Sequence, residues 1–193
     1  MSDRIRCAWV PAGDELYAKY HDEEWGVPVH DDRVMFEFLV LESAQAGLSW
    51  KTVLNKRENY RRLFAEFNPE KIAEFDEAKI ESLLLDAGII RNRAKVRATV
   101  NNAKAFLKVQ NEFGSFTKYI WGFVNGKVID GKRKTIKDLP SRSDVSDALA
   151  KDLKKRGFSF LGTTVCYAYL QATGLINDHS EDCFRYRECS QLS

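Results

Sequence analysis

A carboxylate in an apolar helix face is the first feature of this sequence that could do chemistry. Met35, Phe38, Leu39, Glu42 and Ala46 share one face of the helix expected before Gly47. A carboxylate buried on such a face is costly unless another group satisfies it. Glu42 therefore needs a partner, which is either a basic residue elsewhere in the chain or a ligand.

A break between two helices positions this carboxylate. Gly47 is a natural end for the helix that carries Glu42, because glycine enters the left-handed region at low cost. Ser49 is a natural N-cap for a helix that begins at Trp50. Leu48 lies between the two helices.

Cysteines and histidines near the two ends of the chain form a second candidate site. Cys7 and His21 lie near the N-terminus, and His179 and Cys183 lie near the C-terminus. Two cysteines and two histidines make a closed tetrahedral zinc set. Four protein ligands leave no open position for water, so such a zinc ion would be structural.

Spacing alone leaves this ligand set open. Cys189 competes with Cys183, and His30 competes less well with His21. Four unrelated residues near the termini would give the same pattern. Cys166 lies in an apolar helix and is predicted to be a core thiol. Four cysteines in a cytosolic chain of this size argue against a disulfide framework.

The remaining sequence predicts a mostly or wholly α-helical fold in one domain, residues 1–193. Strand signals are sparse, and 44% hydrophobic residues exclude a disordered chain. One continuous helix is expected from Trp50 to about Phe67, and N-caps are expected at Asp14, Asp31 or Asp32, Asn68, Asp76, and Ser143 or Asp144. For residues 126–142 we expect a polar, basic loop with room for a short hairpin, and we assign no chemistry to it.

Composition also narrows the class of protein. No apolar run is long enough to span a bilayer, and the segment Met1 to Arg6 lacks the apolar core of a signal peptide. We therefore expect a cytoplasmic protein with no membrane partner. The net charge is only +2, but residues 91–110 hold six bases and no acid. They form either a solvated helix face or an anion-binding strip.

A tight turn between two helical segments is a candidate phosphate site. The turn runs from Asp86 to Arg93, with a glycine at Gly88. Backbone N–H groups at the start of the second helix would face an anion there. An ordinary helical hairpin gives the same pattern. The turn, within a hairpin at about 76–110, is similar to the helix-hairpin-helix motif of DNA-repair glycosylases, which grips a DNA phosphate. This similarity makes Gly88 and Ile90 candidate DNA contacts.

Several motifs in one order carry a resemblance that covers nearly the whole chain. They are Cys7-Ala8-Trp9, Tyr20-His21-Asp22-Glu23-Glu24-Trp25-Gly26-Val27-Pro28, Leu41-Glu42 to Trp50, Asp86-Ala87-Gly88-Ile89-Ile90, and Gly162-Thr163-Thr164 through Asn177-Asp178-His179. In these motifs the chain resembles the 3-methyladenine DNA glycosylase I family, within the helix-hairpin-helix superfamily. The resemblance implies an all-α fold, one structural zinc per chain at Cys7, His21, His179 and Cys183, and a monomer in a bacterial cytoplasm.

The resemblance also implies an activity and its residues. Such an enzyme flips 3-methyladenine out of double-stranded DNA and hydrolyses its N-glycosidic bond, leaving an abasic site. Leu48 is then either a leucine that packs the loop or a wedge that fills the space left by the flipped base. The family's pocket carboxylate matches Glu42, its stacking residue matches Trp50, and its other pocket aromatics match Tyr17, Tyr20 and Trp25. The superfamily's usual catalytic aspartate has no convincing counterpart here, and the resembled family itself lacks that residue.

Chemistry explains why this set suits a methylated base. Alkylation at N3 gives adenine a positive charge, so the base leaves neutral and needs little acid catalysis. Aromatic rings attract such a cation, and Glu42 would accept hydrogen bonds from the exocyclic amine. Two rival hypotheses remain: a zinc-stapled DNA-binding module without catalysis, and a helical interaction protein whose aromatics only fill the core. A buried acid is unnecessary for either.

Overall fold

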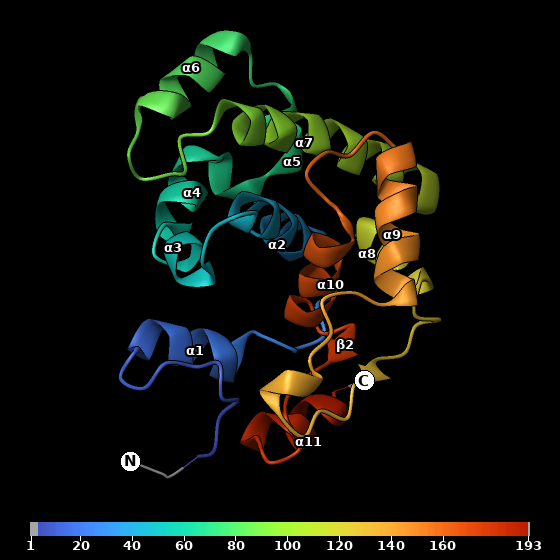
Figure 1. The fold of residues 1–193 in the computed structure, drawn as a ribbon. Coiled ribbons are helices and arrows are strands. Elements are labelled where there is room, and N and C mark those ends of the chain that lie inside the picture. The colour runs from blue at the N-terminus through green and yellow to red at the C-terminus, as the bar shows by residue number, and fades with distance from the viewer. Residues whose placement is uncertain (1–3, 193) are drawn as a thin grey trace.

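The computed structural model describes residues 4–192, so Met1 to Asp3 of the polar N-terminal segment and Ser193 lie outside the described residues. Within that range the fold is mostly helical, as expected (Figure 1). No helix in the described part of the chain is long and apolar enough to cross a membrane. The elements are α1 (Glu15–Glu23), α2 (Asp32–Gln45), α3 (Trp50–Leu54), α4 (Arg57–Leu63), η1 (Ala65–Phe67), α5 (Pro69–Ala73), α6 (Glu77–Leu85), α7 (Arg93–Phe113), α8 (Phe116–Gly122), β1 (Ile129–Asp130), η2 (Ile136–Asp138), α9 (Asp144–Lys155), α10 (Thr163–Ala172), β2 (Ile176–Asn177) and α11 (Phe184–Ser190).

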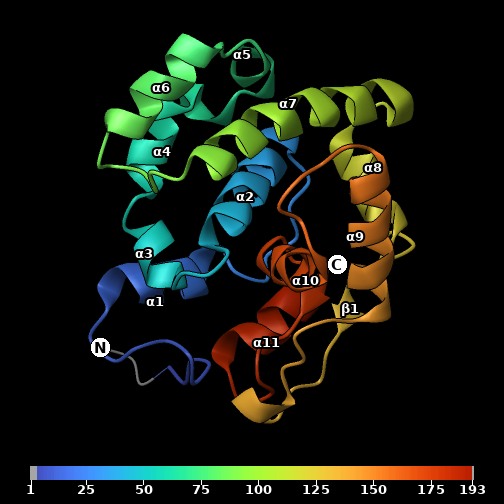
Figure 2. The same ribbon diagram turned by 45° about the horizontal axis from the view of Figure 1, so that its top comes forward.

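Helix α2 is the centre of the fold. It contacts α3, α7, α8, α10 and η1, and both views show it in the middle of the molecule (Figures 1 and 2). Every residue from Met35 to Ala44 is buried, so the helix is covered on all sides. The predicted apolar face is therefore part of a longer segment, Met35 to Ala44, that is buried all round. Ala46 is the C-cap residue and not part of the helix proper.

Side-chain caps fix where the helices begin. Asp14, Ser49, Asn68 and Asp76 each accept a hydrogen bond from a backbone N–H in the first turn, as predicted. Of the two pairs that the sequence left open, Asp31 caps α2 and Ser143 caps α9.

Asp32 serves another helix. Its carboxylate accepts hydrogen bonds from the N–H groups of Phe116 and Thr117 at the start of α8. This carboxylate therefore joins the start of α2 to the start of α8.

The prediction of one continuous helix from Trp50 to about Phe67 is wrong. The chain instead forms α3, α4 and the short 3-10 turn η1. Ala65, Glu66 and Phe67 all have φ between 49° and 55°, in the left-handed region that helices cannot continue through. The break lets both Phe64 and Phe67 enter the core, where each is at most 1% exposed. Packing therefore overrides the helical pattern of the sequence.

The hairpin considered for residues 126–142 does not form. Ile129 and Asp130 instead pair in parallel with Ile176 and Asn177 of the C-terminal segment. The rest of this segment crosses the C-terminal region, because Glu181 N–H donates to the carbonyl of Arg133. We call residues 130–139 the strap.

The N-terminal segment lies against the start of the C-terminal helix. The N–H of Phe184 donates to the carbonyl of Ile5 over 3.0 Å. This contact places the segment before α1 against the start of α11, so residues far apart in sequence can share one site.

Candidate active site and metal centre

A cavity of about 200 Å³ lies where α1, α2, α3 and α10 meet. It is lined by Trp9, Tyr17, Tyr20, Trp25, Glu42, Gln45, Trp50, Leu139, Ala168 and Gln171. The structure thus brings together all five residues predicted to form a base pocket: the carboxylate and the four aromatic residues. We call this cavity the aromatic pocket.

Aromatic rings pack against one another around the pocket, in edge-to-face and tilted pairs. Trp9 contacts Trp25 at 4.9 Å between ring centroids and Tyr17 at 5.7 Å, both in edge-on geometry. Tyr20 and Trp50 lie 5.1 Å apart in a tilted pair. Aromatic pairs prefer such edge-on and tilted geometries, so the rings stabilise one another as they line the pocket.

Glu42 is buried in this pocket and has no partner. It is 4% exposed, and its carboxylate makes no hydrogen bond or ion pair within residues 4–192. Burial raises its pKa from the ordinary value of 4.5 to about 8. The sequence left two possible partners, a basic residue or a ligand, and no basic residue of the described chain pairs with Glu42.

The indole of Trp50 is a second unsatisfied group in the pocket wall. Its Nε1 is buried without a hydrogen-bond acceptor among the described residues. Buried N–H groups are rarely left unpaired in native proteins. An unpaired carboxylate in the pocket, beside a lining residue with an unpaired donor, indicates a polar ligand.

The loop after α2 borders a second cavity, which shares Glu42, Gln45 and Ala168 with the aromatic pocket. This second cavity, also about 200 Å³, is lined by Glu42, Gln45, Ala46, Gly47, Leu48, Thr164, Val165 and Ala168. Gly47 has φ of +78°, as its predicted role at the end of α2 requires. Leu48 is 42% exposed at this loop. A side chain that wedges into DNA would need this exposure, and an ordinary loop leucine can also have it.

Lys95 fixes the same loop from α7. Its Nζ donates to the carbonyls of Ala44 and Ala46, over 2.9 and 2.6 Å. These carbonyls end α2, where a cation is favoured by the helix dipole. Burial lowers the pKa of Lys95. A residue of the basic strip therefore acts inside the protein.

Other members of the basic strip are also engaged. Arg93 and Arg97 pair with the acids Glu77 and Glu81 of α6. Arg91, Lys104 and Lys108 are exposed and have no ion-pair partner in the described chain. The anion-binding charge is therefore smaller than the count of six bases suggests.

Two amides of the predicted phosphate turn have partners within the chain. Gly88 N–H donates to Asp86 over 2.7 Å, and Ile90 N–H donates to the hydroxyl of Tyr60 over 3.3 Å. A phosphate would have to displace or share these bonds. The turn between α9 and α10 differs, because the Gly162 cap offers no side-chain acceptor to the first amides of α10.

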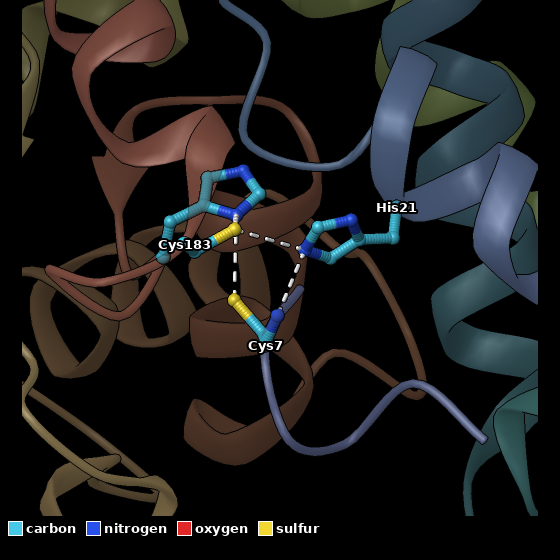
Figure 3. A group of neighbouring side chains, drawn as sticks. Cys7, His21 and Cys183 are labelled. Atoms are coloured by element: carbon cyan, nitrogen blue, oxygen red, sulfur yellow. Dashed lines mark hydrogen bonds between the residues drawn. The ribbon is translucent and has the colours of Figure 1, made fainter. Parts of the chain in front are cut away.

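The four predicted metal ligands lie in one buried cluster. Cys7, His21 and Cys183 point toward one another from the N-terminal segment, α1 and the C-terminal segment (Figure 3). With His179, their ligand atoms all lie within 4.8 Å of one another. Cys189, the competing cysteine, is buried outside this cluster, and His30 stacks on Trp121 instead.

The donor set and its spacing fit a tetrahedral ion. Cys7 Sγ lies 3.4 Å from His179 Nδ1, and Cys183 Sγ lies 3.5 Å from His21 Nε2. Ligands bonded to zinc at roughly 2.0–2.3 Å stand about 3.4–3.8 Å apart in a tetrahedron. The pKa of Cys183 is lowered, which favours a thiolate. Contact with Cys7 is the largest cause, burial opposes it, and contacts with both histidines lower the pKa further.

Each histidine also has an outer partner that orients its ring. The Nδ1 atom of His21 lies 2.8 Å from the carboxylate of Asp22, which Arg6 holds in turn. The Nε2 atom of His179 lies 3.0 Å from the carbonyl of Trp25. Metal-bound histidines characteristically give their second N–H to a carboxylate or carbonyl. The cluster could therefore hold a metal ion.

Sequence reasoning did not single out every residue of the aromatic pocket. Trp9, Gln45, Ala168 and Gln171 lie within motifs of the resemblance but were assigned no role, and Leu139 lies outside those motifs. Gln45 lies close to Glu42 on α2, so helical spacing could have found it. Leu139 comes from the strap, and no local pattern indicates that this segment reaches the pocket.

The comparison with known proteins decides the family. The methyladenine glycosylase family profile matches residues 9–186 of the chain. The chain belongs to this family.

Curated relatives agree. DNA-3-methyladenine glycosylase 1 of Escherichia coli K12 is 49% identical over 181 residues, which cover 94% of this chain and 96% of that protein. DNA-3-methyladenine glycosylase of Haemophilus influenzae is 47% identical over 178 residues, covering 92% and 96%. The methyladenine glycosylase assignment therefore extends over nearly the whole of each protein.

Solved structures match the fold as closely. A crystal structure of 3-methyladenine DNA glycosylase I has a TM-score of 0.91 and 50% identity, covering 93% of this chain and 98% of that one. A variant of such an enzyme in complex with 3-methyladenine has a TM-score of 0.90 and 40% identity, covering 93% and 96%. That enzyme therefore binds the free base on the same fold.

Proposed function

We propose that this methyladenine glycosylase excises 3-methyladenine from alkylated double-stranded DNA, by hydrolysing its N-glycosidic bond and leaving an abasic site. The observation that carries the proposal is Glu42, a buried carboxylate without a partner in an aromatic pocket. A non-catalytic DNA-binding module has no need of such a group, and neither does a helical interaction protein.

The lesion supplies the charge that the pocket lacks. Methylation at N3 makes the base cationic, so its departure as a neutral base needs little acid catalysis. Tyr17, Tyr20, Trp25 and Trp50 are the electron-rich rings that would surround it, each desolvated contact contributing about 2 kcal/mol. Normal adenine is neutral and would gain less from the same rings.

Glu42 acts in this proposal as the residue that selects the base. Its carboxylate accepts hydrogen bonds from the exocyclic amine and pairs with the positive ring. An empty pocket leaves the group without compensation, as its raised pKa shows. A cationic base reverses that penalty, whereas a neutral one does not, so the discrimination is electrostatic.

We propose that one structural zinc ion per chain occupies the cluster of Cys7, His21, His179 and Cys183. Support comes from the donor set, its spacing and the outer partners of both histidines. Zinc supplies no chemistry here, because four protein ligands leave no open position. The residues themselves join the chain's two ends beside Trp25, a wall of the aromatic pocket.

Leu48 is proposed to fill the DNA stack after the base has left it. The phosphate turn at Gly88 and Ile90 lies on one side of this loop, since Lys95 of α7 bonds the loop's carbonyls. The start of α10 lies on another side, since Thr164 lines a cavity with Leu48. We propose that both turns hold the DNA backbone.

Charge insertion tests the two turns separately. Ala87→Glu and Thr164→Glu place an acid at exposed positions in the respective turns. Each should weaken binding to undamaged duplex DNA severalfold at low salt and flatten its salt dependence. Ser82→Glu on α6 is the exposed control. If Ala87→Glu binds as the control does, Gly88 and Ile90 are not DNA contacts.

The protein is further proposed to act as a monomer in the bacterial cytoplasm. In support of the monomer, one chain supplies every residue that lines the aromatic pocket. Release of free 3-methyladenine from methylated DNA, followed by chromatography, tests the activity. DNA binding without release would favour the non-catalytic module, and neither binding nor release would favour the interaction protein.

A further inference from the structure

Gln171 is a pocket residue to which the chemistry above gives no part. It projects from α10, lines the aromatic pocket with Glu42, and is half-buried. Its Nε2 donates to Oδ2 of Asp178 over 2.7 Å. No other hydrogen bond of its side chain is found within the described residues.

Asp178 is a fixed anchor for that amide. Its side chain is fully buried, and Oδ1 accepts from Arg133 Nε over 2.8 Å. Oδ2 also accepts from the hydroxyl of Tyr167 over 2.5 Å, and Arg133 reaches the same hydroxyl over 3.2 Å. A Cβ on Gly131 would lie 2.0 Å from Oδ1, so the strap closes directly over this carboxylate.

The anchor determines which way the amide of Gln171 points. A carboxylate that already takes a guanidinium and a phenol can only accept from a third neighbour. The atom of Gln171 that faces Asp178 must therefore be the nitrogen. The oxygen, Oε1, is left as an acceptor without a partner in a residue that lines the pocket.

Asp178 itself is a poor candidate for direct chemistry. It does not line the aromatic pocket, and both of its oxygens are occupied. Its bonds instead hold other residues, which is the pattern of a positioning residue.

We propose that Gln171 is a specificity-determining residue, whose Oε1 accepts a hydrogen bond from the exocyclic amine of the flipped adenine, with Asp178 as its positioning residue. This inference rests on the proposed excision of 3-methyladenine and deepens it. Glu42 distinguishes a charged base from a neutral one. Gln171 distinguishes adenine from guanine among bases methylated at N3.

The two purines differ at the atom concerned. Adenine carries an amine at position 6, which donates, whereas guanine carries a carbonyl oxygen there, which accepts. If the amide of Gln171 cannot flip, Oε1 accepts a hydrogen bond from the amine of adenine. Against guanine the same Oε1 faces a carbonyl oxygen, and no hydrogen bond forms because neither atom carries a proton. A glutamine free to flip would accept from the amine of adenine and donate to the carbonyl of guanine. The Asp178 anchor is therefore what makes Gln171 selective.

The test uses the full-length protein and DNA methylated to contain both 3-methyladenine and 3-methylguanine. Gln171→Met keeps the length of the side chain and removes its acceptor. We expect the single-turnover release of 3-methyladenine to fall roughly tenfold or more, the loss of one hydrogen bond to a charged group. Release of 3-methylguanine should change at most about twofold, so the ratio shifts toward guanine.

A second variant and a control complete the experiment. Tyr167→Phe loosens the anchor without touching Gln171, so the ratio should shift in the same direction by less. Gln191→Met, at an exposed position outside the pocket, should leave both rates unchanged. A wild-type ratio in both Gln171→Met and Tyr167→Phe would overturn the inference, whether the rates fall together or not at all. Failure of the wild type to release 3-methyladenine would instead overturn the proposed function.

Discussion

Glu37 and Glu42 lie on the same helix and are both buried, yet only one of them has a partner. Glu37 accepts from Arg57 over 2.6 Å and from Arg61 over 2.8 Å, and Glu24 shares Arg57. Glu42 has no such contact. A buried acid with a structural role, such as Glu37, is thus paired with arginines of the same chain. The lack of any such pair at Glu42 supports a ligand as its partner.

Removal of the Glu42 charge should stabilise the empty protein at high pH. Because the folded pKa of about 8 lies above the ordinary 4.5, the folded state holds the proton more tightly. Wild-type stability therefore falls as the pH rises between these values, and Glu42→Gln avoids that fall. Thermal melts at pH 5 and pH 9 should show similar midpoints at pH 5 and a higher midpoint for the variant at pH 9. An equal midpoint at pH 9 would contradict this.

Glu37→Gln is the matched comparison and should behave in the opposite way. It leaves the buried Arg57 with one acid fewer, at a cost on the order of 3 kcal/mol. Chemical denaturation at neutral pH should show that loss. A variant as stable as the wild type would mean that Arg57 is satisfied by Glu24 alone.

Sequence reasoning found one of these acids and missed the other. Glu42 stood out because it lies among apolar residues at helical spacing. Glu37 lies off that face, and only the complete burial of α2 makes it a core residue. Its partners are on α4, so no pattern within α2 could reveal the ion pair.

At the scale of elements, the loop after α2 depends on α7. Lys95 crosses from the first turns of α7 to the last carbonyls of α2. Its position there connects the phosphate turn with the loop that carries Leu48. The sequence predicted both segments as helices with a break, but it placed Lys95 in a basic strip, since nothing local marks an internal contact.

Lys95→Met should therefore impair excision more than a lost surface charge would. The carbonyls of Ala44 and Ala46 lose their cationic donor, so the loop should become less ordered and the protein less stable by about 1–3 kcal/mol. Single-turnover excision and melting temperature measure both effects. Lys104→Met, an exposed residue of the same helix, is the control. Identical behaviour of the two variants would exclude a positioning role for Lys95.

The segment 126–142, which contains the strap, makes contacts that no local sequence pattern could predict. Residues 126–142 are polar and basic, as in many loops, and no chemical role was predicted for them. In the structure they pair with β2, contact Asp178 through Arg133 and place Leu139 in the pocket wall. All of these contacts are made with residues distant in the chain, so they arise only from the tertiary fold.

At the scale of the molecule, the proposed metal closes the chain on itself. Its proposed ligands come from both ends of the chain. Spacing alone left Cys189 and His30 as alternatives, whereas the resemblance implied Cys7, His21, His179 and Cys183, and these are the four residues that the fold brings together. The α-helical fold was predictable from caps and periodicity, and the resemblance added its connection to DNA repair.

Loss of one ligand should open this closure. Cys183→Ser is expected to lower the zinc content from about one per chain to near zero and to lower the melting temperature by several degrees. Elemental analysis and thermal melts provide the readouts. Cys166→Ser, which changes a buried thiol outside the cluster, should retain the metal. Unchanged zinc in the Cys183 variant would exclude the proposed site.

Single-turnover release of 3-methyladenine by the wild type and by Glu42→Gln tests the role of the buried carboxylate most directly. DNA binding and zinc content are measured on the same preparations. We expect the variant to fold, bind DNA and keep its metal, while release falls by roughly 100-fold, the effect of one buried charge that contacts the base. Release at the wild-type rate would show that the unpaired carboxylate in the aromatic pocket does not recognise the lesion.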